Sequence, residues 1–374
     1  MAEFWSPGDM QNVKLTEFLS SRGGKGHHVK GKHLSMEEAF NILSDNERNL
    51  NESGRIFFDT LRKMKPHSFK WVQHGFPVHG LQHVTNGSSV GDIYEEECFK
   101  ITKQPCRPGF KDLLFWSAAV PSEDIETARE KSYEKVSKVL KPWQAKKYKD
   151  RIKEQYANSP AFNEFASRYG NFKFSFSLFH LLSLYQSQHC GGREPQLRIL
   201  GTDMYKQEIA HYILVHSPNK NYQFRDLPIV PTIQGNSQPL PFVYWRDKTL
   251  YWRPESTSSV LTVKISDKGM ARRDCPLPCN YFIKKGYCRD IKEENYKVWS
   301  AWNHLVFAFH LPHKPHLEIS RGELLKSLTT CEIDEAALID ESEHLDLEEA
   351  EEVIHRLKKD FNRRKRMRTS HLLN

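Results

Sequence analysis

The feature that most constrains this chain is an abrupt change of hydrophobic period within residues 172–185. Phenylalanine occupies every second position from 172 to 176 and alternates with lysine and serine. This alternation predicts a strand with one buried aromatic face. From residue 178, leucine and tyrosine recur at helical spacing behind Ser177, a good N-cap. We therefore predict a strand that runs directly into a short helix, and we take this unit as the centre of the core.

Further strand patterns surround this unit. Glu208–His216 is largely apolar on both faces, which is typical of a strand in the middle of a sheet. Phe242–Trp252 reads as an aromatic hairpin with its turn at Asp247-Lys248. Residues 295–311 are compatible with a helix or a strand. The sequence predicts an α+β fold, with a mixed or antiparallel sheet rich in aromatics and flanked by helices.

Changes of composition predict three regions. Residues 1–33 hold a basic, glycine-rich segment that we expect to be disordered. Residues 34–318 are predicted to form a single α+β domain, within the usual upper size of one unit. Residues 319–374 are predicted to be a helical tail, first acidic and then basic. Its amphipathic stripe comprises Leu347, Ala350, Ile354, Leu357 and Phe361.

Composition also limits the compartment. The sequence has no run of about 18 apolar residues, so we expect no membrane span. The N-terminus lacks the basic and apolar regions of a signal peptide. Seven scattered cysteines fit a reducing compartment better than a disulfide framework. We therefore expect an intracellular protein.

The charges are strongly segregated along the chain. The formal net charge is +8, yet residues 332–352 hold eleven acidic side chains and no lysine or arginine. Residues 356–368 then hold eight lysines or arginines and one acid. The basic run predicts nuclear localisation or nucleic-acid contact, unless the acidic block folds back and neutralises it. The residues singled out are Arg363, Arg364, Lys365 and Arg366.

A second basic segment lies in the predicted helix around residues 143–156. A helix face of this kind can follow a phosphate backbone, although charged helix faces are also common solvated surfaces. The residues that would make the contact are Lys146, Lys147, Lys149, Arg151 and Lys153.

The most specific local pattern is a group of cysteines around an aromatic, basic loop. Cys279 and Cys288 flank Tyr281, Phe282, Lys285 and Gly286, and this stretch resembles the first half of a CCCH zinc finger. The resemblance covers about a dozen residues, because Glu294 stands near the expected third cysteine. A closed zinc site needs four ligands, and Cys275, Cys279, Cys288 and His304 would supply them only with an unusual last spacing. The alternative is a loop with unpaired thiols, and we expect no metal.

A catalytic alternative depends on three single residues. Glu208 at the head of a strand is similar to the catalytic-glutamate strand of ADP-ribosyltransferases. His79-Gly80 is similar to their His-Gly strand, and Tyr94 would be the aromatic that stacks on nicotinamide. The resemblance implies a carboxylate that orients a ribose hydroxyl. The alternative is that Glu208 forms a cross-strand pair with Lys206 or Arg198.

The sequence favours a protein that acts by binding rather than catalysis. It has no P-loop and no dinucleotide-binding glycine fingerprint, so we expect no cofactor. The expected partner is nucleic acid or an acidic protein, contacted through the two basic segments in the nucleus, or alternatively in the cytoplasm. The alternatives are an ADP-ribosyltransferase-like enzyme or inactive relative, and a scaffold that docks a partner through the amphipathic stripe. The sequence does not predict an oligomeric state.

Overall fold

A computed structural model shows how these segments assemble. The residues that the structure describes are 27–35, 38, 74–101, 111–138, 141–143, 160–162, 166–167, 169–205, 208–235, 240–254, 260–265, 271–276, 296–300, 302–333 and 345–372.

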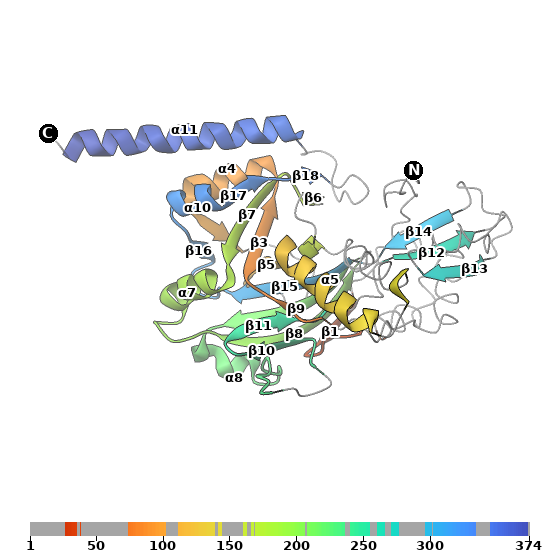
Figure 1. Cartoon of the computed structure of the whole chain (residues 1–374). Helices are drawn as coiled ribbons and strands as arrows, with labels where there is room; N and C mark the ends of the chain where they lie inside the picture. The colour runs from red at the N-terminus through yellow and green to blue at the C-terminus, as the bar shows by residue number, and fades with distance from the viewer. Residues whose placement is uncertain are drawn as a thin grey trace.

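An eight-stranded mixed sheet forms the centre of the molecule (Figure 1). Only the pairing of β9 with β15 is parallel among its described neighbours, and the others are antiparallel. This confirms the predicted α+β class with a mixed sheet. In spatial order the strands are β1 (His27–Lys30), β8 (Gln196–Tyr205), β9 (Glu208–His216), β15 (Trp302–His310), β5 (Leu113–Ala119), β3 (Gly80–Thr85), β7 (Phe172–Ser177) and β17 (Leu328–Thr330).

Smaller sheets accompany the large one. A three-stranded sheet has the order β10 (Val243–Arg246), β11 (Thr249–Trp252) and β2 (Phe76–Pro77). Another has the order β13 (Ala271–Pro276), β12 (Val260–Ile265) and β14 (Tyr296–Ser300). Two-stranded pairs join β16 (His316–Glu318) to β4 (Cys98–Lys100), and β18 (Glu332–Ile333) to β6 (Ala166–Ser167).

The described helices lie around the main sheet. They are α4 (Gly87–Glu96), α5 (Ser122–Ser137), α7 (Leu178–His189), α8 (Asn221–Phe224), α10 (Arg321–Ser327) and α11 (Leu347–Leu372). Short 3-10 turns occur at η3 (Pro160–Phe162) and η4 (Pro218–Lys220). In Figure 1, α11 runs along the top of the molecule above α4 and α10.

The predicted strand–helix unit is confirmed. The three phenylalanines of β7 are buried, whereas Lys173 and Ser175 lie on its other face. The Ser177 Oγ accepts a hydrogen bond from the His180 N–H at 3.1 Å, so it caps α7 as expected. The helix buries the residues with the predicted spacing, which are Leu178, Leu181, Leu182 and Tyr185.

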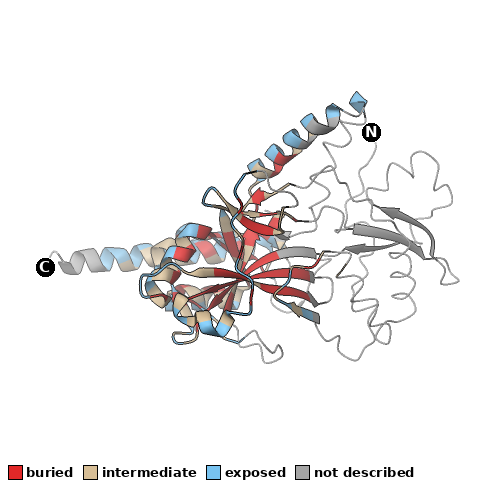
Figure 2. Ribbon diagram, turned by 90° about the horizontal axis from the view of Figure 1, so that it is seen from below, coloured by how far each residue is buried: buried red, intermediate tan, exposed pale blue. Residues whose placement is uncertain are grey.

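Apolar clusters lie on both faces of the sheet, and Figure 2 shows buried residues, in red, concentrated on its strands. One face carries Trp116, Phe174 and Phe307 in the larger cluster, which also includes residues of α7, α11 and the β10–β11–β2 sheet. The other face carries a smaller cluster with Tyr212 and Leu214. Such large buried aromatic areas supply much of the hydrophobic stabilisation.

The predicted hairpin is present, and its turn has the predicted residues. Asp247 and Lys248 have φ angles of 49° and 61°, and β10 pairs antiparallel with β11 across them. Two successive positive φ angles are typical of a type I′ turn, whose twist matches that of the strands. The sequence was compatible with a helix or a strand over residues 295–311, and residues 302–310 form a strand.

Residues on both sides of the predicted region boundaries share the main sheet. β1, which falls in the segment expected to be disordered, pairs along the β8 edge. β17, beyond residue 318, pairs with β7, although a helical pattern was expected there. An edge strand supplies unpaired backbone donors and acceptors, and these recruit short segments whose own side chains do not predict a strand.

Candidate nucleic-acid interface on the C-terminal helix

The first half of α11 packs against the body of the protein. Ala350 and Ile354 are buried in the main core cluster, and Val353 and Leu357 pack against it. Phe361 lies beside α10, where a Cβ added to Gly322 would come within 3.6 Å of its ring. Most of the amphipathic stripe therefore packs on the chain's own core, whereas Leu347 at its start is 39% exposed. Docking of a partner through this stripe stays a prediction.

A buried arginine joins α10 to the end of α4. The Arg321 Nη1 lies 2.8 Å from the Glu97 Oε1, and only 17% of the arginine side chain is exposed. The same guanidinium donates to the backbone carbonyls of Tyr94 and Glu95 at 3.2 and 2.7 Å. These carbonyls belong to the last turn of α4, where helical carbonyls lack intrahelical partners and a cation is favourable. Arg321 thus fixes the surface that receives α11.

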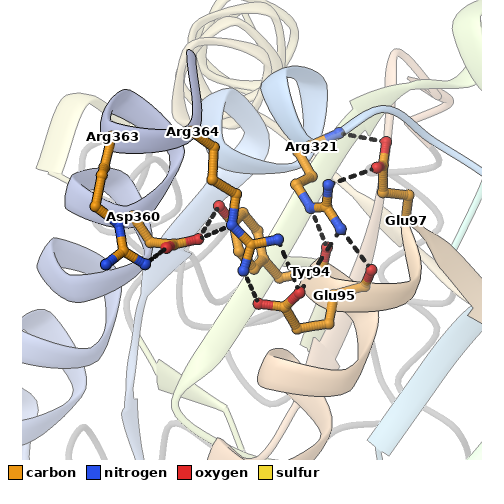
Figure 3. A network of polar contacts seen from close by, with 7 residues as sticks. All are labelled: Tyr94, Glu95, Glu97, Arg321, Asp360, Arg363 and Arg364. Carbon is orange, nitrogen blue, oxygen red and sulfur yellow. Dashed lines mark hydrogen bonds and ion pairs between the residues drawn. The ribbon is translucent and has the colours of Figure 1, made fainter. Parts of the chain in front are cut away.

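A second arginine fastens α11 to this surface (Figure 3). The Arg364 Nη1 and Nη2 donate to the two carboxylate oxygens of Glu95 at 3.1 and 2.8 Å, in bidentate geometry. Its Nε lies 2.6 Å from the Asp360 Oδ2, and the Tyr94 hydroxyl donates to the same oxygen at 3.3 Å. We call Tyr94, Glu95, Asp360 and Arg364 the α11 clamp.

The clamp shifts the pKa values of its members. Burial, followed by the charge of Asp360, raises the pKa of Tyr94. Desolvation alone would raise the pKa of Asp360, but the hydrogen bond from Arg363 and the charge of Arg364 lower it overall. Chiefly the hydrogen bond to Glu95 raises the pKa of Arg364. These shifts keep Tyr94 neutral and Asp360 and Arg364 charged near neutral pH.

The opposite side of α11 carries a row of exposed cations. At 100° per residue, the four side chains lie within an arc of about 80° and point away from the buried stripe. With a rise of about 1.5 Å per residue, the row extends over roughly 15 Å. We call this the basic face, and its members are Arg356, Lys359, Arg363 and Arg366, all exposed.

No known protein family, curated protein or solved structure matches the chain. No helix in the described part of the chain is long and apolar enough to cross a membrane. Across the same residues, no three histidine, cysteine, aspartate or glutamate side chains converge to hold a metal ion. The interpretation of the basic face therefore depends on its geometry and charge.

The predicted basic residues of the tail separate into two groups. Arg364 faces the body and belongs to the α11 clamp. Arg363 and Arg366 lie on the basic face, and Lys365 is also exposed. Arg363 donates to the Asp360 Oδ1 at 2.9 Å but keeps 69% of its side chain exposed. The other predicted basic segment, Lys146, Lys147, Lys149, Arg151 and Lys153, lies outside the described residues.

The three residues of the catalytic alternative are not gathered into one site. Glu208 begins β9 and His79 precedes β3, and three strand-to-strand steps separate these strands, about 14 Å. The His79 Nε2 lies 3.9 Å from the Asp124 Oδ2, and burial raises the pKa of Asp124. Tyr94 is buried, with Arg321 stacked 5.6 Å from its ring centroid and its hydroxyl bound to Asp360. Its ring is therefore occupied by internal contacts.

The candidate zinc ligands are only partly described. The main chain of Cys275 lies in β13, opposite Thr262 of β12. The main chain of His304 lies in β15, opposite Ala210 of β9. Cys279 and Cys288 lie outside the described residues. The zinc hypothesis stays a prediction.

Sequence reasoning missed part of this surface. Arg356 and Lys359 belong to the basic face, and their spacing from Arg363 at helical intervals was a usable signal. No local signal predicted that Glu95 would pair with both Arg321 and Arg364, because these residues are far apart in sequence.

Proposed function

We propose that this protein binds nucleic acid through the basic face of α11, and that it acts by binding rather than catalysis. The supporting observation is the division of cations on one helix. Arg364 is committed to carboxylates of the protein, whereas the four residues of the basic face project from the opposite side. A straight row of cations matches the regular array of phosphates along a nucleic acid.

Acidic side chains within α11 do not neutralise this row. The acids Glu348, Glu349, Glu351 and Glu352 occupy the first turns of the helix, whereas the basic face begins at residue 356. In the Arg363–Asp360 pair the arginine side chain is 69% exposed and the aspartate side chain 21% exposed, and such surface pairs contribute little free energy. A phosphate oxygen can therefore replace the Asp360 carboxylate at small cost.

Salt dependence tests this proposal. Four phosphate contacts predict that log K falls with a slope of about −3.6 against log salt, or roughly 100-fold between 50 and 200 mM. The assay is fluorescence anisotropy with labelled DNA and RNA. Replacement of Arg356, Lys359, Arg363 and Arg366 by glutamine should remove most of this slope.

A matched control separates the basic face from net charge. A variant with Lys30, Lys111, Arg193 and Arg225 replaced by glutamine also removes four exposed cations, and it should bind almost as the wild type does. An equal loss of nucleic-acid affinity in both variants would contradict specific binding by the basic face. Equal affinity of the wild type for poly-glutamate would identify an acidic protein as the partner instead.

We also propose that the protein is nuclear and that residues 363–366 carry the import signal. Replacement of these four residues by alanine should move a fluorescent fusion to the cytoplasm. Because this variant also breaks the clamp, Glu95→Gln serves as the control, and it should remain nuclear. Unchanged localisation of the alanine variant would count against the signal. A separate variant of residues 146–153 tests the second basic segment in both assays.

A further inference from the structure

A pair of stacked tyrosines marks one face of the β10–β11–β2 sheet. Tyr244 and Tyr251 lie directly opposite each other in the register, with ring centroids 5.5 Å apart and an interplanar angle of 12°. The alternate residues Val243, Leu250 and Trp252 point the other way into the main core. The tyrosine pair therefore lies on the opposite side of the small sheet from these residues. Tyr244 is itself buried, with 2% of the residue exposed, whereas Tyr251 is partly exposed.

Two arginines stand on either side of this pair. The Arg246 Cζ lies 5.3 Å from the centroid of the Tyr244 ring. Arg253 follows β11, where its N–H donates to the Phe242 carbonyl at 2.8 Å. Both positive charges act on the Tyr244 hydroxyl, whose pKa burial nevertheless raises. The charges of both arginines thus act on the buried Tyr244 hydroxyl.

Both arginine side chains are partly exposed, and neither has a counter-ion among the described residues. The Nε atoms of Arg246 and Arg253 are both buried without a hydrogen-bond partner. No carboxylate in the described part of the chain forms an ion pair with either arginine. A desolvated cation without an acceptor is costly, so such groups are usually satisfied by an anion. An anion that binds here would face the positive charges of both Arg246 and Arg253.

We propose that this face of the β10–β11 hairpin is a binding site for a phosphate monoester, with Arg246 and Arg253 as the anion ligands. A phosphate monoester carries a charge of about −1.5 to −2 at neutral pH, which balances two guanidinium groups, whereas a carboxylate balances one. Arginine is suited to this role because its planar fork presents several donors to phosphate oxygens. The site is independent of the basic face of α11.

Calorimetric titration of the full chain tests the site, with inorganic phosphate and adenosine monophosphate as separate probes at constant ionic strength. Both should bind if the site recognises phosphate alone, and tighter binding of the nucleotide would show that the ester group is also contacted. Arg246→Gln and Arg253→Gln should each weaken binding about 10-fold or more, because each removes charge-assisted hydrogen bonds. Lys248→Gln removes an exposed cation from the turn of the same hairpin and should change the affinity less than about twofold.

Stability in the absence of phosphate provides a second readout. If the arginines await an anion, either glutamine variant unfolds at the same temperature as the wild type or a higher one, because a buried Nε donor without a hydrogen-bond partner is removed. If Arg246 serves only to stack on Tyr244, its replacement lowers the melting temperature and phosphate has no effect. Failure of the wild type to bind either probe at 10 mM, or equal binding by all variants, would overturn the site.

Discussion

The buried histidine at the end of β15 should make this protein sensitive to mild acid. Only 3% of His310 is exposed, its Nδ1 lacks a hydrogen-bond partner, and its ring meets that of Phe224 edge-on at 4.9 Å. Desolvation lowers its pKa to about 4, and the opposing charge of Asp112 offsets this only in part. His216, Lys220 and His313 lower it further.

The direction of the effect follows from proton linkage. In the unfolded chain this imidazole titrates near 6.5, whereas in the folded state it stays neutral down to about 4. Between these values the unfolded state binds more protons, so stability falls as the pH falls. From pH 7.5 to pH 5, His310 alone should lower the free energy of unfolding by about 2 kcal/mol. The carboxylates with lowered pKa values, such as Glu318, lose their contribution only at lower pH.

Urea unfolding, followed by tryptophan fluorescence, measures the free energy of unfolding at pH 7.5, 6.5, 5.5 and 5.0. His310→Phe removes the titrating group and keeps a ring beside Phe224, so the difference between pH 7.5 and pH 5 should shrink by about 2 kcal/mol. His313→Phe, three residues further along and exposed, should change the pH dependence far less, because the charge of His313 is only a minor cause of the lowered His310 pKa. The reasoning would be refuted if the free energy of unfolding had the same pH dependence in the wild type and in His310→Phe. It would also be refuted if both variants reduced that pH dependence equally.

Three further changes test the fold and the clamp. Gly170→Ala should lower the free energy of unfolding by at least about 3 kcal/mol in urea denaturation, because φ is 144° there and a Cβ would lie 2.1 Å from the Thr85 carbonyl oxygen. Ser177→Ala should cost about 1 kcal/mol by the same measurement, through loss of the α7 cap. Arg364→Gln should lower the free energy of unfolding less than either of these changes, since its pair with Glu95 is partly exposed. A double-mutant cycle with Glu95→Gln should assign most of that cost to the pair.

The sequence predicted best where a pattern is local. The alternation that defines β7, the cap at Ser177 and the hairpin turn at Asp247-Lys248 each depend on neighbouring residues, and all three are confirmed. The assignment failed for β1 and β17, because each forms by pairing with the exposed backbone of another strand. Their own side chains carry no strong preference, and tertiary contacts therefore decide their structure.

The candidate sites divide in the same way. A two-residue turn fixes the register of the hairpin, so the placement of Tyr244 opposite Tyr251 follows from the sequence once the turn is recognised. The absence of a counter-ion beside Arg246 among the described residues does not follow from the sequence. Any distant segment of the chain could have supplied a carboxylate there. The role of Arg364 was equally hidden, since its acceptor Glu95 comes from another helix.

The two proposed anion surfaces lie on separate parts of the molecule. α11 runs along the top of Figure 1, whereas β10 and β11 lie near its lower edge beyond the main sheet. Changes at sites this far apart, with no shared partner, usually contribute additively. Loss of the basic face should therefore leave phosphate affinity at the hairpin unchanged, and loss of Arg246 should leave the salt slope of nucleic-acid binding unchanged. Coupling between the two variants would instead require one ligand that spans both surfaces, or a conformational change that links them.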